Sequence, residues 1–283
     1  MPSHEPAPGL LPIPEIVPDW PAFTPVRARD LPPLHRRQLL DKHVAVPRPS
    51  RLLDQLLSPE FINQASPRQL ADLVVGEPLL ATRVLRAVNS PFYGLPQPVT
   101  SIVQAVTYLG LTTVRITCLR YIFIAAFKTT DPRRQQAIDR LWLAGSLASD
   151  LMHRAAPALQ LNDAGRWASA VLLSFLGRLA VVASAPAEQL SALSDADPVL
   201  RVGAEQEVLG ICAAELGRLL MSDWGLPATV VDDAADIEWL LFGPPPGTSV
   251  RASADERNEA LAVCALCVRL DRKSTRLNSS HGI

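Results

Sequence analysis

The most constraining feature of this sequence is the stretch of residues 77–119, in which two helical patterns flank a turn. Pro78 suits the first position of a helix, because the N–H group that proline lacks would have no partner there. Apolar residues then recur every four positions, which indicates a helix with one buried face. We expect Asn89 to end this helix in the left-handed conformation, and Pro91 prevents Ser90 from continuing it.

The turn and the second helix of this stretch are also marked by their residue types. Gly94 and the two prolines that follow it keep the turn out of regular structure. Thr100 or Ser101 can cap a new helix, and Gln104 stands three residues past Ser101, as in a capping box. Gly110 is expected to end this second helix.

The rest of the chain, from residue 50 onward, has the pattern of successive capped amphipathic helices. Strand-type alternation of apolar and polar residues is not convincing anywhere, so we predict an all-α fold. A capping box at Ser66 to Gln69 opens one helix, and Asp131 caps another, long one. The later predicted helices are residues 168–184, 199–224, 227–241 and 254–270.

Both ends of the chain differ from this helical body. Residues 1–48 are assigned to a leader, because residues 1–49 hold 12 of the 26 prolines and cannot form a regular domain. The leader is interpreted as partly disordered or draped over the domain, with a docking arm for a partner as the alternative. The helical domain is assigned to residues 49–271, with a glycine-proline linker at residues 243–247. Residues 272–283 fit no helix pattern and resemble translated sequencing-adapter sequence, so we expect this tail to be non-native.

Composition excludes several classes of function. With 48% apolar residues, 19% charged residues and a formal charge of −1, the chain can bury a core but has no basic surface that would favour nucleic acid. Residues 168–187 are apolar, yet Arg178 lies near their middle, which favours a buried core helix over a membrane span. Four cysteines without a secretory signal favour a reducing compartment, and we expect a cytoplasmic protein.

Two segments carry a resemblance to a known family. Residues 79–94 (LLATRVLRAVNSPFYG) and 100–110 (TSIVQAVTYLG) resemble the signature of the HDOD domain, found in bacterial signalling proteins related to the HD metal-dependent phosphohydrolases. The resemblance covers about residues 49–241 and implies a single multi-helix domain. The residues that carry it, in a structural or interaction role, are Asn89, Ser90, Pro91, Phe92, Gly94, Ser101, Gly110, Trp224 and Pro227.

The same resemblance points to a missing catalytic site. HD phosphohydrolases hold divalent metals with histidine and aspartate ligands, and these metals activate a water molecule. The resemblance places Ser174 and Phe175 at the histidine-aspartate dyad, and Ala213 at a later histidine. Of the five histidines, only His153 lies within the helical body. We therefore expect no catalytic residue, no metal and no cofactor, and we expect Phe175 to fill the former site.

Two other groups of polar residues admit a functional and a structural interpretation. Asp232, Asp233 and Asp236 could hold Mg²⁺ without histidine, but together with Glu238 they are better explained as a solvated helix face. His153 is interpreted as a surface or hydrogen-bonded side chain.

The cysteines and arginines are treated in the same way. Cys264 and Cys267 have the spacing of a redox or zinc pair, but they lie in an apolar helix and are better explained as core residues. Four arginines near the signature could bind an acidic partner, although surface arginines usually only solvate: Arg83, Arg86, Arg115 and Arg120.

The favoured hypothesis is a non-catalytic signalling or scaffold module that acts through contacts with regulatory proteins. Two alternatives stay open: a residual metal-dependent phosphohydrolase with a rearranged site, and a nucleotide-binding sensor. The missing histidines argue against the first alternative. No membrane or nucleic-acid partner is expected.

Overall fold

The computed structural model describes residues 26–43, 52–193, 198–241 and 256–280, and every regular element within these ranges is a helix. The predicted all-α class is therefore confirmed. The first half of the chain forms η1 (Ala28–Asp30), α1 (Pro33–His43), α2 (Leu52–Leu56), α3 (Pro59–Gln64), α4 (Pro67–Val75), α5 (Pro78–Val88), η2 (Pro91–Tyr93), α6 (Ile102–Leu109) and α7 (Leu111–Ala126). The second half forms α8 (Pro132–Ala158), α9 (Ala164–Ser174), α10 (Leu176–Ser184), η3 (Ala187–Gln189), α11 (Leu190–Leu193), α12 (Pro198–Leu209), α13 (Ala213–Asp223), α14 (Ala228–Leu240) and α15 (Glu256–Ser280).

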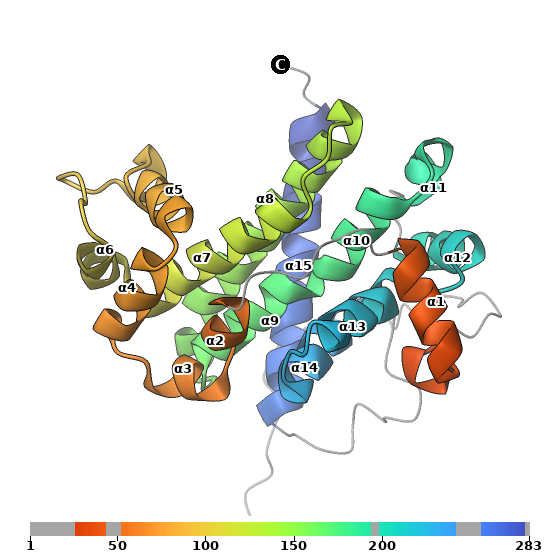
Figure 1. Ribbon diagram of the computed structural model, residues 1–283, viewed down its shortest axis with the longest axis horizontal. Coiled ribbons are helices and arrows are strands. Elements are labelled where there is room, and N and C mark those ends of the chain that lie inside the picture. Colours follow the sequence, from red (N-terminus) through yellow and green to blue (C-terminus); the bar gives the residue numbers. More distant parts are fainter. Residues whose placement is uncertain (1–25, 44–51, 194–197, 242–255, 281–283) are drawn as a thin grey trace, which may run out of the picture.

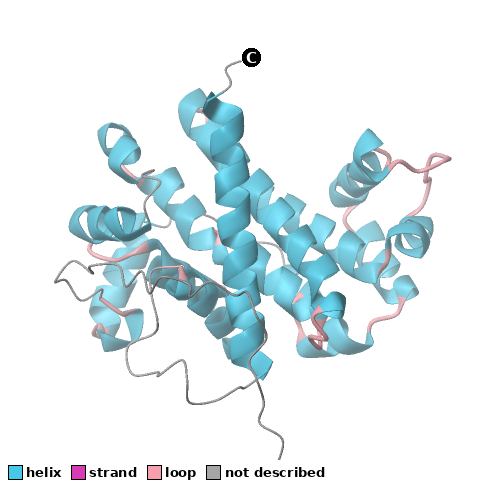
Figure 2. Cartoon of the chain, turned by 180° about the vertical axis from the view of Figure 1, so that it is seen from behind, coloured by secondary structure: helices cyan, strands magenta, loops and turns pink. Residues whose placement is uncertain are grey.

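The helices form two parts that α7 connects (Figure 1). The larger part packs α8 against α9 and α15, and α13 against α10 and α14. Seen from behind, α15 runs through the middle of the molecule (Figure 2). The smaller part consists of α2 to α6, in which α4 packs on α6 and α5 packs on α7. One continuous core of buried apolar residues runs through both parts.

Local capping accounts for several helix boundaries. Ser66 and Gln69 form the predicted capping box, with Ser66 N–H donating to Gln69 Oε1 at 2.7 Å. Asp131 caps α8 by accepting from the backbone N–H groups of Arg133 and Arg134. These bonds use donors that a helix start would otherwise leave unpaired, so the chain begins its helices where the sequence predicts them.

Two predicted helices are each divided in two. Phe175 interrupts the predicted helix 168–184 and separates α9 from α10. Gly210 interrupts the predicted helix 199–224, since it adopts φ +78°, a conformation that glycine reaches without a Cβ clash. A third prediction was wrong at the C-terminal end: α15 continues to Ser280, whereas residues 272–283 were expected to fit no helix.

The leader packs on the domain where the structure describes it. The N–H of Ala28 donates to Glu215 Oε2 at 2.8 Å, and Arg27 stacks its guanidinium over the ring of Trp239 at 4.6 Å. Helix α1 lies against α13 and α10, far from α2 in Figure 1. Residues 26–43 therefore contact the helical domain. The other leader residues and the predicted linker at residues 243–247 lie outside the described ranges.

The apolar stretch of α9 and α10 is part of the core. Residues Ala164–Ser184 are long and apolar enough to cross a membrane by length and composition, but 83% of their most apolar window is buried inside the protein. Within the described residues this is the one stretch of that kind, and its burial agrees with the predicted core helix.

Candidate functional site

The positions that the resemblance assigns to a metal-binding dyad lie in the core, at the junction of α9 and α10. Ser174 is buried, and its hydroxyl donates to the carbonyl of Val171 at 2.8 Å. Phe175 is 1% exposed, and its ring lies so close to α8 that a Cβ atom on Gly145 would be 3.2 Å from it. A hydroxyl bonded within its own helix and a phenyl ring offer no metal ligand here.

The third position, Ala213, lies where two helices touch through their backbones. A Cβ atom on Gly177 of α10 would overlap the carbonyl oxygen of Ala213, the first residue of α13. A Cβ atom on Gly217 would be 2.9 Å from the backbone nitrogen of Gly177. Helices α10 and α13 therefore cross at backbone contact, and the glycines make that crossing possible.

A buried charge cluster that sequence reasoning missed lies beside Ala213. Arg201 forms ion pairs with Glu205 at 3.2 Å and with Glu238 at 3.4 Å, and all three side chains are 1% exposed. The N–H of Ala213 donates to Glu205 Oε2 at 2.8 Å. Burial raises the pKa of Glu205, while Arg201 and this N–H group lower it. The spacing of Arg201 and Glu205 by four residues was the signal in the sequence.

Two of the four acidic residues of α14 are buried, so the predicted solvated helix face is wrong for Asp233 and Glu238, whereas Asp232 is exposed and Asp236 is half-buried. Asp233 and Glu238 are each 1% exposed. Asp233 accepts from Arg166 Nε at 2.8 Å and from Arg257 Nε at 3.0 Å, and Asp236 pairs with Arg257 at 2.9 Å. Because guanidinium groups already occupy these oxygens, the carboxylates are held as ion pairs.

These ion pairs line a pocket of about 750 Å³ where the leader meets α13, α14 and α15. Arg218 pairs with Asp232 and Asp236 within it. Among the described residues, no group of three or more histidine, cysteine or acidic side chains is arranged to hold a metal. The pocket brings both charge signs together, and we assign it to joining the leader to the domain.

The signature turn is held by Asn89, but in a different way from the one predicted. Asn89 adopts φ −82° rather than the left-handed conformation. Its Oδ1 accepts from Val99 N–H at 2.7 Å, and its Nδ2 donates to the carbonyl of Val99 at 2.8 Å and to that of Leu85 at 2.9 Å. One amide side chain thus ties the end of α5 to the segment that enters α6, and the turn between them closes.

The other signature residues shape the same turn or the core. Gly94 takes the left-handed conformation at φ +57°, Ser101 caps α6 through Gln104 N–H, and Gly110 ends α6 at φ +83°. The side chain of Phe92 lies outside the described part of the turn. Gln104 Oε1 accepts from Thr100 N–H at 3.0 Å, whereas the predicted capping box would have it accept from Ser101 N–H.

The two signature residues near the C-terminal end are structural. Trp224 is 1% exposed, and its ring stacks on that of Phe123 at 6.0 Å. Phe123 stacks in turn on Trp142 at 5.8 Å, which joins α7, α8 and the end of α13. Pro227 precedes α14, and its carbonyl accepts from Val230 and Val231 N–H groups.

The contacts of Asn89 lead to a stability prediction. Asn89→Gly removes three hydrogen bonds without straining the backbone, so we expect unfolding free energy to fall by roughly 1–3 kcal/mol. The neighbouring Ser90, whose side chain makes no capping bond, serves as control, and Ser90→Ala is expected to change stability by about 0.5 kcal/mol or less. Urea unfolding measures both, and equal midpoints for Asn89→Gly and wild type would contradict the role of the amide.

A small pocket of about 180 Å³ opens beside the signature turn, between η2, α7 and α8. Its lining includes Ser90 and Tyr93 from the turn, Arg120 from α7 and His153 from α8. Arg120 Nε and His153 Nδ1 are buried without a hydrogen-bond partner. Burial lowers the pKa of His153; the nearby Asp150 raises it, and Arg115 and Arg154 lower it.

Arg115 is not a surface residue, contrary to the prediction for the signature arginines. It is fully buried, and its Nη2 donates to the carbonyl of Gly165 at 2.7 Å and to Ser169 Oγ at 3.2 Å. Its Nε and Nη1 atoms have no partner, and burial lowers its pKa to about 10. Arg83 and Arg86 are exposed on α5, as expected. The interior behind the small pocket is therefore positively charged.

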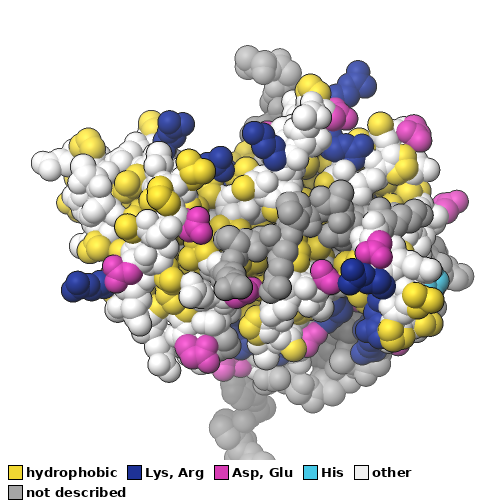
Figure 3. All heavy atoms as spheres, in the orientation of Figure 1, with side chains coloured by type: hydrophobic (Ala, Val, Ile, Leu, Met, Phe, Trp, Pro, Cys, Tyr) yellow, Lys and Arg dark blue, Asp and Glu magenta, His cyan; other side chains and the backbone are white. Residues whose placement is uncertain are grey.

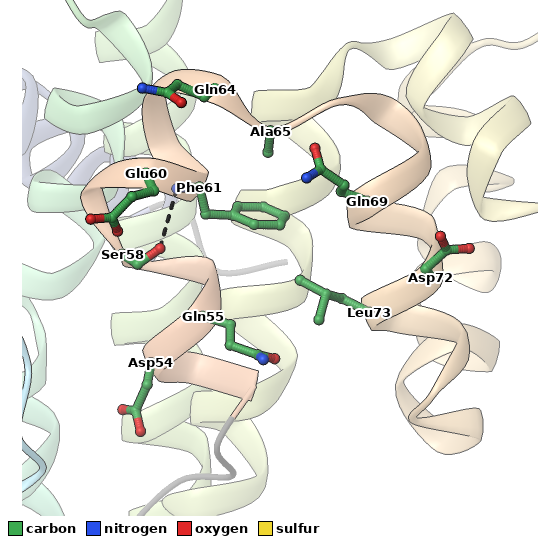
Figure 4. A pocket seen from close by; sticks show the side chains of 10 residues that line it. All are labelled: Asp54, Gln55, Ser58, Glu60, Phe61, Gln64, Ala65, Gln69, Asp72 and Leu73. Atoms are coloured by element: carbon green, nitrogen blue, oxygen red, sulfur yellow. Dashed lines mark hydrogen bonds between the residues drawn. The ribbon is translucent and has the colours of Figure 1, made fainter.

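A wider pocket of about 720 Å³ lies between α2, α3 and α4 (Figure 4). Phe61 and Leu73 point toward one another across it. Its charged lining residues are all acidic: Asp54, Glu60 and Asp72. Nothing in these side chains marks a specific ligand.

Cys264 and Cys267 are core residues, as predicted, and the other two cysteines are buried as well. Cys118, Cys212, Cys264 and Cys267 are free and buried. Burial raises the pKa of Cys118 and of Cys212 to about 12 and also raises that of Cys264 and Cys267. A thiol that is held neutral in this way is a poor nucleophile and a poor metal ligand.

Comparison with known proteins agrees with this architecture. The model of the HDOD domain matches residues 47–238. An HDOD domain protein of unknown function from Geobacter sulfurreducens has a similar structure, with a TM-score of 0.64, 18% identity, and coverage of 83% of this chain and 76% of that one. A protein from Shewanella amazonensis that is provisionally assigned as a phosphohydrolase aligns with a TM-score of 0.58 and 19% identity, over 84% and 81% of the two chains.

A third structure, provisionally assigned as a signal transduction protein from Marinobacter aquaeolei, aligns with a TM-score of 0.56 and 20% identity. This alignment covers 83% of this chain and 54% of that longer one. No curated protein sequence matches the chain significantly. At these identities the structural matches show a shared fold.

Proposed function

This chain belongs to the HDOD domain family, and we propose that it is a non-enzymatic member that acts in a bacterial regulatory pathway through contacts with other proteins. The observation that carries this proposal is the burial of Phe175 against Gly145, at the position that the resemblance assigns to a metal-binding aspartate. A catalytic metal centre needs ligands around an open position for water and substrate. At the assigned aspartate position this chain has a buried phenyl ring, which offers neither a ligand nor room for water.

The surroundings of the other ligand positions support the same proposal. Ala213 lies at the backbone contact of α10 and α13, and the nearest buried carboxylate, Glu205, is paired with Arg201. The Mg²⁺ site considered on α14 is not supported either, because Asp233 and Asp236 already form ion pairs with arginines. A residual phosphohydrolase would have to break these ion pairs before it could bind a metal.

The regulatory part of the proposal rests on family membership and on the kind of relatives found. One structural relative is provisionally assigned to signal transduction, the role that we propose for this chain. The free, buried cysteines fit a reducing environment, and we propose a cytoplasmic location.

Metal content tests the non-enzymatic part directly. Protein that is expressed in medium supplemented with Fe, Mn and Zn and then purified should carry no stoichiometric metal, because Phe175 and Ala213 stand where ligands are needed. Elemental analysis measures this, and a phosphodiesterase assay on the same sample should show no turnover. About one equivalent of bound metal, or metal-dependent turnover, would refute the proposal.

Affinity capture from the native host, followed by mass spectrometry and by size-exclusion chromatography with the purified candidate, tests the interaction part. A regulatory protein that co-elutes with the chain as a defined complex is the expected result. If no protein forms such a complex, the chain does not act as an interaction module.

A further inference from the structure

One side of α8 carries an apolar stripe that no other described helix covers. Leu143, Leu147 and Leu151 recur every four residues, and their exposed fractions are 50%, 41% and 40%. Eight residues of helix span about 12 Å, or two turns. Single exposed leucines are ordinary on a protein surface, but a continuous stripe along one helix face is typical of an interaction surface.

The stripe leads into the small pocket beside the signature turn. Leu143 and Leu147 line this pocket together with Ser90 and Tyr93 of the turn. We call the pocket and the three leucines the α8 groove. At about 180 Å³ the pocket is smaller than the roughly 300–1,000 Å³ of most ligand sites. A cavity of about 150 Å³ holds one benzene ring, so this pocket suits one large apolar side chain and not a nucleotide.

The charged residues that line the groove favour an acidic occupant. Arg120 and His153 line the pocket with buried nitrogen atoms that have no partner, and Arg115 adds a positive charge behind them. The acidic lining residue, Asp150, is already paired with Arg154 at 2.8 Å. Lysine and arginine side chains also gather over α5 and α8 along the upper edge of the molecule in Figure 3. A carboxylate of an occupant would be attracted to the positive charges of Arg120 and Arg115.

We propose that the α8 groove docks an amphipathic helix of a partner protein, which inserts one large apolar side chain into the pocket and places carboxylates beside Arg120 and His153. The proposal rests on the proposed interaction function and assigns its surface. It also gives the signature turn a second role, because the turn that Asn89 holds forms one wall of the pocket.

A displayed library of helical peptides tests this proposal. The peptides share a fixed polar scaffold, one face varies among apolar residues, and the flanking positions vary between glutamate and lysine. Selection on the full chain should recover peptides with a bulky apolar anchor and with glutamate one turn away. Their affinity should fall at least about fivefold on Leu147→Ser and on Arg120→Gln. Leu200→Ser removes a leucine from α12 that is more exposed than Leu147, at 63% against 41%, and should leave affinity unchanged.

Other results would overturn the assignment of the groove. The first is the selection of peptides with lysine at the flanking positions. The second is the selection of peptides whose affinity does not change on Leu147→Ser. The third is a selection that recovers no binding peptide. If Leu147→Ser leaves the complex with the host partner intact, the surface is wrong while the interaction function stands. If no host partner exists and metal-dependent turnover is found, the proposed function itself fails. A small organic anion that binds the pocket in place of any helix would likewise refute the docking proposal.

Discussion

Replacing Ser174 with histidine and Phe175 with aspartate in one variant should lower the free energy of unfolding by roughly 3 kcal/mol or more and should not restore hydrolysis. The phenyl ring of Phe175 is buried against α8, so its removal loses apolar burial and leaves a cavity. The new carboxylate would then be buried without a partner, which costs several kcal/mol more. Ala213 still supplies no imidazole, so a metal would lack a ligand.

The measurement is thermal unfolding of the double variant with and without Mn²⁺, together with a phosphodiesterase assay. Phe175→Leu is the matched control, because it keeps the site apolar and should cost only about 1 kcal/mol. A double variant that Mn²⁺ stabilises and that turns over substrate would show that the site is dormant and not filled. A double variant as stable as the wild type would show that Phe175 does not contribute to the core as we propose.

Helix starts could be predicted from the sequence because their causes are local. Ser66, Ser101 and Asp131 each bond backbone groups within four residues, and each begins a helix where predicted. Asn89 shows the limit of this reasoning. It was expected to act locally, as a left-handed helix end, but its amide binds Val99 ten residues away. Only the closed turn brings these two residues together.

The break between α9 and α10 could not be predicted, because the apolar periodicity continues across it. Phe175 is as apolar as its neighbours, so nothing in the residue types separates α9 from α10. The break at Gly210, by contrast, has a signal in the sequence, because glycine inside a helical pattern often marks the end of the helix.

The burial of charge was the main error about the site. Arginine and aspartate are usually exposed, so Arg115 and Asp233 were assigned to the surface. Both are buried because partners from distant parts of the chain pair with them: Gly165 and Ser169 for Arg115, and Arg166 and Arg257 for Asp233. No spacing rule in a single sequence predicts such pairs.

The crossing of α10 and α13 gives the second large prediction. Gly177→Ala should lower the free energy of unfolding by roughly 3 kcal/mol, although it adds only one methyl group. The new Cβ atom would overlap the carbonyl oxygen of Ala213, and backbone atoms cannot rotate away as a side chain can. Helices α10 and α13 would have to separate, which would open the core beside the buried pair of Arg201 and Glu205.

Gly76→Ala is the control for the added methyl group. Gly76 is exposed and adopts a right-handed helical conformation at φ −60°, and a Cβ atom added there would lie 3.3 Å from its nearest neighbouring atom. It should therefore change stability by about 1 kcal/mol or less. Urea unfolding of both variants measures the difference. Because the contact at Gly177 is between backbones, truncating nearby side chains should not rescue Gly177→Ala. Rescue by such a truncation, or a stability equal to that of Gly76→Ala, would mean that the two helices cross at a greater distance than the structure shows.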